Sequence, residues 1–233
     1  MGGATKVKGE RRKQLAADVN CLVSATHFLP LFLISSDETF LVDSSVSTVY
    51  LSHRNRDPVK AAEFISRTLY RIIHLDMSLE SALDSAAAAT GDSFISSKLD
   101  DAKKKVVESL DTSSQLHREP FVDDIAITSM ARLWEVGKSE PIKIGKASPT
   151  EGALPAALYL ALKYKDSLPE ALTANANIGG DSAARGIVVG MLLGAVHGRD
   201  ALPVEWLSSL NSLSRVSTLF DNIGVHGQKN REL

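Results

Sequence analysis

The stretch from Asn175 to Gly198 contains a Gly-Gly-Asp turn and holds the polar residues whose types and spacing are best suited to contacting a ligand. Two consecutive glycines, Gly179 and Gly180, precede Asp181 and a serine at the start of an apolar run. A side-chain oxygen at such a position can accept hydrogen bonds from the free N–H groups of a helix start. The sequence therefore predicts a polar corner rich in backbone groups, with Asp181 as a helix cap, a ligand contact, or both.

The apolar run after this corner carries a glycine at every fourth position, namely Gly186, Gly190, Gly194 and Gly198. Residues four apart lie on one face of a helix, so these glycines would form a stripe. Each interior glycine costs about 1 kcal/mol relative to alanine. A helix that contains several of them is therefore expected to pack very closely against another backbone.

Helices are also predicted along the rest of the chain, and they would position this corner. Apolar spacing, capping residues and first-turn prolines mark helices at 14–34, 41–51, 57–73, 79–89, 100–110, 124–136, 151–163, 168–177 and 202–210. The acidic pairs Asp100-Asp101 and Asp123-Asp124 are interpreted as caps and surface charge at helix starts. No segment shows sustained alternation with hairpin turns, so the predicted fold class is all-α, a helical bundle.

Composition is that of an ordinary globular protein. Of the 233 residues, 44% are hydrophobic and 23% charged, and the formal net charge of -2 argues against nucleic-acid binding through bulk charge. The single cysteine, Cys21, leaves no internal disulfide, and no apolar run reaches the roughly 20 residues of a membrane span. We expect a cytoplasmic or nuclear protein without a nucleic-acid or membrane partner.

Four segments resemble the ADP-ribosylglycohydrolase family. Residues 145–160, 167–174 and 177–198 resemble two consecutive helices and the C-terminal signature of that family, and 49–73 resembles a segment with a Thr/Ser-His step before a long helix. From the first to the last they span residues 49–198, about two-thirds of the chain. The resemblance implies a compact, orthogonal all-α bundle.

The resemblance also implies a function and a cofactor. Intact members of the family hydrolyse the glycosidic bond between ADP-ribose and a protein side chain or related acceptor. They use two divalent ions, Mg²⁺ or Mn²⁺, held by an N-terminal Thr-Asp-Asp step and a C-terminal Asp-Thr-Asp-Thr step. Carried over to this chain, the metal-side residues are Asp181 and Ser182. The substrate-side residues are His53, Gly179, Gly180 and Arg185.

The chain departs from the family pattern at both metal steps. Ala183 and Ala184 stand where the second aspartate and the following threonine are usual, and no Thr-Asp-Asp step occurs. A methyl group cannot coordinate Mg²⁺, which takes oxygen ligands. The variant step followed by Arg185 resembles a divergent branch that includes the J-type eye-lens crystallins. This favours a second hypothesis, a catalytically inactive binding or structural protein that retains the fold.

Several candidate residues have a structural interpretation beside the functional one. His53 is either an adenine or ribose contact or a loop histidine before the helix at Pro58. Arg185 either contacts a diphosphate at the helix start or forms an internal ion pair. His27 is interpreted as a partly buried residue at the end of an apolar helix.

The predicted organisation is a basic, flexible N-terminus at 1–13, one helical domain at 14–223 and a polar tail at 224–233. Relative to the family the domain is expected to be incomplete, because the resemblance places the start of the chain about a third of the way into the usual domain. A natural short form, a truncated product and an incomplete gene model each fit this pattern.

Overall fold

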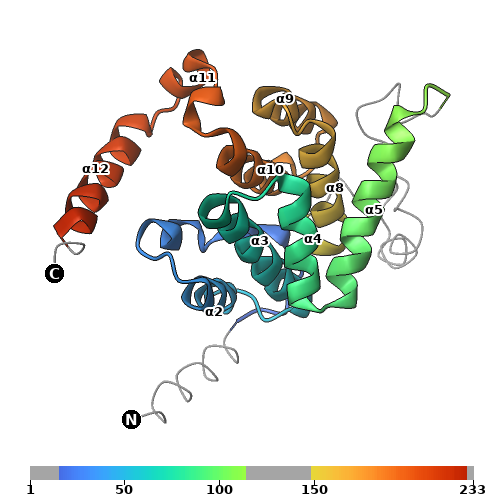
Figure 1. Ribbon diagram of the computed structural model, residues 1–233, viewed down its shortest axis with the longest axis horizontal. Helices are drawn as coiled ribbons and strands as arrows, with labels where there is room; N and C mark the ends of the chain where they lie inside the picture. Colours follow the sequence, from blue (N-terminus) through green and yellow to red (C-terminus); the bar gives the residue numbers. More distant parts are fainter. Residues whose placement is uncertain (1–15, 114–147, 230–233) are drawn as a thin grey trace, which may run out of the picture.

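In the computed structural model, residues 16–113 and 148–229 are described, with side chains through Asn222. Every regular element in these ranges is a helix, which confirms the predicted all-α class (Figure 1). The longer helices are α2 (Glu38–Val49), α3 (Arg56–Leu75), α4 (Leu79–Thr90), α5 (Ser93–Leu110), α8 (Thr150–Lys163), α9 (Leu168–Ile178), α10 (Ser182–His197) and α12 (Leu213–Lys229). The short ones are η1 (Leu22–Thr26), η2 (Leu29–Leu33), η4 (Arg199–Ala201) and α11 (Val204–Ser208).

A polar side chain caps the start of most of the long helices. Each of these side chains accepts a hydrogen bond from a backbone N–H of the first turn, which would otherwise lack a partner. The capping residues are Asp37, Asn55, Ser78, Asp92, Ser167 and Asp181. Local sequence therefore sets where these helices begin.

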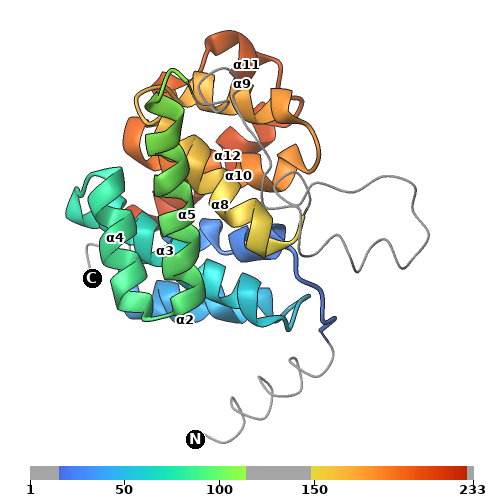
Figure 2. The ribbon, with the colours of Figure 1, turned by 90° about the vertical axis from the view of Figure 1, so that its right-hand side faces the viewer.

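The core lies around α3, α8 and α10. α8 is buried at every position from Gly152 through Leu162, and it packs against α5, α9 and α10. α3 packs against α2, α4 and η1 and also contacts α10. Figures 1 and 2 show α3, α8 and α10 in the middle of the bundle, with α2 and α5 toward its outside. This arrangement holds the start of α10 beside the end of α9.

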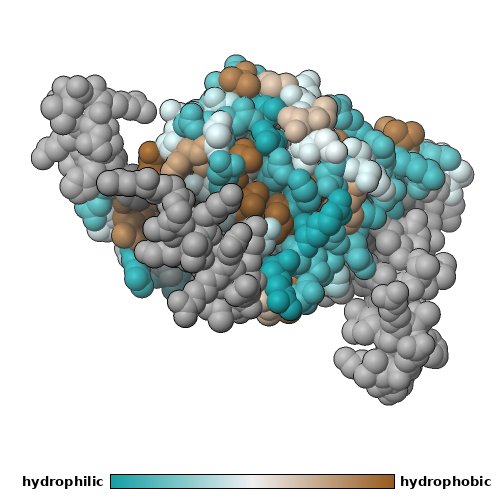
Figure 3. Space-filling view, turned by 90° about the horizontal axis from the view of Figure 1, so that it is seen from below, coloured by the Kyte–Doolittle hydropathy of each residue, from teal (hydrophilic) through white to brown (hydrophobic). Residues whose placement is uncertain are grey.

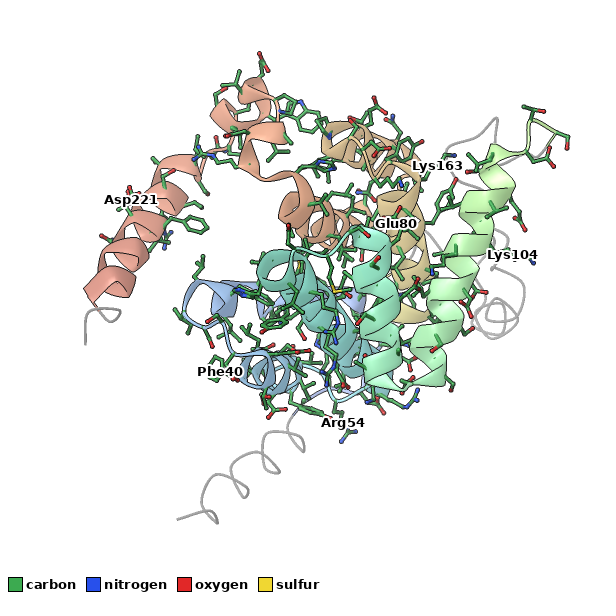
Figure 4. The ribbon with its side chains drawn as sticks, in the orientation of Figure 1. Phe40, Arg54, Glu80, Lys104, Lys163 and Asp221 are labelled. Carbon is green, nitrogen blue, oxygen red and sulfur yellow. The ribbon has the colours of Figure 1, made fainter. Side chains whose placement is uncertain are left out.

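The last helix, α12, projects from the bundle (Figure 1). Its Val216, Leu219 and Phe220 side chains are exposed, and Asp221 lies on this helix, apart from the other labelled residues in Figure 4. Residues 224–229, which the sequence assigned to a polar tail, are helical. On the face shown in Figure 3, polar side chains predominate and apolar ones form smaller patches between them.

Two predictions about helix starts are wrong. The helix predicted at 14–34 is replaced by the short turns η1 and η2, because Pro30 interrupts the segment and the backbone of Ala17 and Leu22 pairs with distant backbone instead. Asp100 and Asp101 lie in the interior of α5, where Asp101 forms an ion pair with Lys98. The helix predicted at 124–136, the pair Asp123-Asp124 and the basic segment 1–13 fall outside the described residues.

The close packing expected along the glycine stripe occurs only at its first member. A Cβ placed on Gly190 or Gly194 would meet no described atom within 4 Å, whereas one placed on Gly186 would lie 2.9 Å from Nδ2 of Asn175. Ile187, three residues before Gly190 and therefore next to it on the helix surface, is also exposed. The lower helix propensity of glycine relative to alanine at positions 190 and 194 is therefore not offset by close packing against the described residues.

Replacing Gly190 or Gly194 by alanine tests this arrangement. Each substitution is expected to raise the free energy of unfolding by about 0.5–1 kcal/mol, because alanine is the better helix former and the added methyl has space. Urea denaturation measures the change. Gly91→Ala serves as the comparison and should lower stability, because Gly91 has φ +60°. A loss of stability at 190 and 194 would show that a neighbour does pack there.

Candidate functional site

The turn between α9 and α10 is built from two glycines in left-handed backbone conformations. Gly179 has φ 74° and Gly180 has φ 67°, values that L side chains rarely adopt. Gly180 is exposed, while Asp181 and Ser182 are half-buried. The N–H of Ser182 donates to the carbonyl of Gly180 at 2.9 Å, which closes the turn. The predicted polar corner therefore exists, and its backbone reaches the surface.

Asp181 caps α10, as predicted. Its Oδ1 accepts a hydrogen bond from the N–H of Ala184 at 3.1 Å. Its second carboxylate oxygen has no hydrogen-bond partner among the described residues. Capping uses one oxygen and leaves the other available, so the two interpretations of Asp181 are compatible.

Arg185 lies in the first turns of α10 and is fully buried, with 0% of its surface exposed. Its Nη2 donates to the carbonyl of Gly179 at 2.6 Å, and its Nε donates to Oδ1 of Asn175 at 3.2 Å. The guanidinium therefore fastens the end of α9 from inside the protein. Both of these partners are neutral groups, so the contacts are internal to the protein but are not the ion pair that the sequence analysis weighed.

Asn175 is a residue of this site that the sequence analysis missed. It is buried in the last turns of α9, and its Nδ2 donates to the carbonyl of Ser182 at 2.8 Å. The available signal was weak, since an asparagine among small helical residues has no distinctive spacing. Only the fold brings it against both Arg185 and Ser182.

His53 lies in another part of the chain, between α2 and α3. Its backbone forms an isolated bridge with Ala17, and its Nδ1 lies 2.7 Å from the hydroxyl of Ser52. Burial lowers the pKa of His53 below its ordinary value, and the charge of His27 lowers this pKa further. None of its hydrogen bonds within the described residues reaches the Gly179–Ser182 turn. His27 itself is exposed, contrary to the partly buried position expected for it.

The donor set of the turn does not fit a pair of divalent ions. Divalent hard cations are bound by several oxygen ligands, and a two-metal centre needs more carboxylates than one. Asp181 supplies one carboxylate and Ser182 one hydroxyl, whereas Ala183 is exposed and Ala184 buried as methyl groups. No group of three acidic, histidine or cysteine side chains suited to a metal occurs in 16–113 or 148–222.

Comparison with known proteins decides the family. The family model described as ADP-ribosylglycohydrolase matches residues 3–231, nearly the whole chain. The chain belongs to the ADP-ribosylglycohydrolase family. No curated protein matches it.

Membership of the ADP-ribosylglycohydrolase family confirms the resemblance read from the C-terminal segments. Membership also agrees with the helical architecture of the chain. Among the described residues, no helix is long and apolar enough to cross a membrane. Family membership leaves the roles of individual residues as proposals.

Removing the buried guanidinium is expected to destabilise the protein. Arg185→Ala leaves the Gly179 carbonyl and Asn175 Oδ1 without these donors, and should lower the free energy of unfolding by about 2–4 kcal/mol. Urea denaturation measures the change. Arg54→Ala, at an exposed arginine labelled in Figure 4, is the control and should change stability by less than about 0.5 kcal/mol. Equal effects at the two positions would contradict the structural role of Arg185.

The environment of His53 predicts a pKa below the ordinary histidine value of 6.5. Because the pKa of His53 is lower in the folded state than in the unfolded state, neutral His53 contributes its full stabilisation above pH 6.5. This contribution to the free energy of unfolding is lost as the pH falls through the pKa of the folded state. A proton NMR titration of the His53 ring measures the midpoint. The variant His27→Ala should move that midpoint upward. A midpoint at or above 6.5 in the unsubstituted protein would contradict the burial of this ring.

Proposed function

We propose that this member of the ADP-ribosylglycohydrolase family binds ADP-ribosyl groups at the Gly179–Ser182 turn without metal-assisted hydrolysis. The observation that carries the proposal is the combination of a surface glycine turn with a carboxylate that has one oxygen available. Oδ2 of Asp181 and the hydroxyl of Ser182 stand together on this turn. The ligand class follows from the family, and the mode of action follows from the residues of this chain.

The chemistry of the turn suits parts of an ADP-ribosyl group. A carboxylate oxygen can accept hydrogen bonds from ribose hydroxyls, and a serine hydroxyl can both donate and accept. The start of α10 presents backbone N–H groups, and helix N-termini favour the negative charge of a diphosphate. Because Gly180 carries no side chain and is exposed, a ligand can approach the backbone closely.

The same residues argue against hydrolysis by the usual family route. A divalent metal pair, where present, orients a water and the ribose and stabilises developing charge. The described turn offers one carboxylate for that purpose, since Ala183 and Ala184 replace oxygen donors with methyl groups. Binding without turnover is the function that this donor set supports best.

The test combines a binding measurement with a hydrolysis assay. Isothermal titration with ADP-ribose, with and without Mg²⁺, should show binding that does not depend on the metal. Ligand at a hundredfold excess over its dissociation constant should stabilise the fold by about 2.7 kcal/mol in a thermal melt. ADP-ribosyl-arginine and ADP-ribosyl-serine peptides incubated with Mg²⁺ should remain intact.

The variant Asp181→Asn separates ligand contact from capping. Asparagine is also a good N-cap, so the melting temperature should change little, while loss of the carboxylate should weaken ADP-ribose binding about tenfold. Asp200→Asn, at an exposed aspartate after α10, is the matched control and should bind normally. Absence of binding by the unsubstituted chain, or Mg²⁺-dependent release of ADP-ribose, would overturn the proposal.

A further inference from the structure

The side chain of Asn175 joins three parts of the chain that meet at the candidate site. Its Oδ1 accepts from Nε of Arg185 at 3.2 Å, and its Nδ2 donates to the carbonyl of Ser182 at 2.8 Å. Arg185 in turn donates to the carbonyl of Gly179 at 2.6 Å. The residue at each end of the glycine turn is therefore tied to the same buried amide, directly or through one guanidinium.

The chemistry of these contacts requires an amide at position 175. Arginine has only donors and a backbone carbonyl only accepts, so the side chain between them must accept on one atom and donate on another. Asparagine does both within one short group, and its two partners fix which atom is oxygen and which nitrogen. Aspartate could keep only the contact with Arg185, and an apolar residue could keep neither.

Gly186 supplies the space that Asn175 occupies. A Cβ at position 186 would lie 2.9 Å from Nδ2 of Asn175, closer than side-chain carbons approach other atoms in real proteins. The next two glycines of the stripe, Gly190 and Gly194, show no such contact with described residues. Within this stripe, the glycine required by close packing is therefore the one that faces Asn175.

We propose that Asn175 is a positioning residue that sets the conformation of the Gly179–Ser182 turn and, through it, the affinity of the turn for its ligand. The inference rests on the proposed function for the identity of that ligand. Asn175 is buried and acts through Ser182 and Arg185, without touching the ligand itself. Backbone with positive φ at two successive glycines has many alternatives, and the amide selects one of them.

The variant Asn175→Asp can keep the contact with Arg185 but loses the hydrogen bond to the carbonyl of Ser182. The carboxylate retains an acceptor for Arg185, so the protein should fold, but it places an acceptor against the carbonyl of Ser182. We expect ADP-ribose binding to weaken about tenfold at a temperature well below the melting transition. Asn211→Asp, the same change at an exposed position between α11 and α12, is the control and should bind normally.

The variant Gly186→Ala disturbs the Asn175 amide without changing Asn175 itself. Its added methyl displaces Asn175, so binding should weaken as it does in Asn175→Asp. Gly190→Ala, four residues along the same helix, is the matched control and should leave binding unchanged. Agreement between the two variants that disturb the amide, with both controls normal, supports positioning over a general loss of stability.

A readout without ligand keeps this inference separate from the proposed function. Backbone amide NMR signals of residues 179–184 should shift in Asn175→Asp and Gly186→Ala, while signals from α3 and α4 stay in place. If the unsubstituted protein binds no ADP-ribose but these signals move, the proposed ligand is wrong and the positioning role stands. Unmoved signals, or variants that bind as tightly as the unsubstituted protein, would overturn the role of Asn175.

Discussion

The fully buried guanidinium of Arg185 is the constraint on which the candidate site depends. A charged group inside a protein is tolerated only when its donors are hydrogen-bonded. Two of those donors reach the Gly179 carbonyl and the Asn175 amide, so these bonds of the charged group also fasten α9 to α10. The hydrogen bond from the buried Arg185 side chain to the Gly179 carbonyl therefore helps to set the conformation of the glycine turn.

The position of that charge depends in turn on the helices around it. α8, buried along almost its whole length, and α3 pack against α10 and fix the start of this helix within the core. Asp181 then caps the same helix from outside, while Arg185 holds it from inside. The surface of the turn stays open because its residues are small and its tight contacts lie below it.

The family of the protein and the chemistry of its turn indicate different things: the family indicates a ligand class, and the turn indicates how few metal-binding groups are present. Membership of the ADP-ribosylglycohydrolase family suggests ADP-ribosylated substrates, whereas Ala183 and Ala184 after Ser182 offer no oxygen atom to a metal ion. Recognition of a ligand needs fewer precisely placed groups than catalysis on it. A fold can therefore keep a binding turn after the donor set for a metal pair has been replaced.

The sequence by itself determined most of the described helices and their starts, the family and the polar corner at Asp181, because capping and amphipathic spacing act over only a few residues. It misjudged 14–34, where distant backbone pairing replaced a helix, and it gave every glycine of the stripe the same role. Only the tertiary structure decided that Arg185 points inward, that Asn175 belongs to the site and that Gly186 alone of the three interior glycines faces a close neighbour among the described residues. Those outcomes depend on which helix packs against which, and that is set by the whole core.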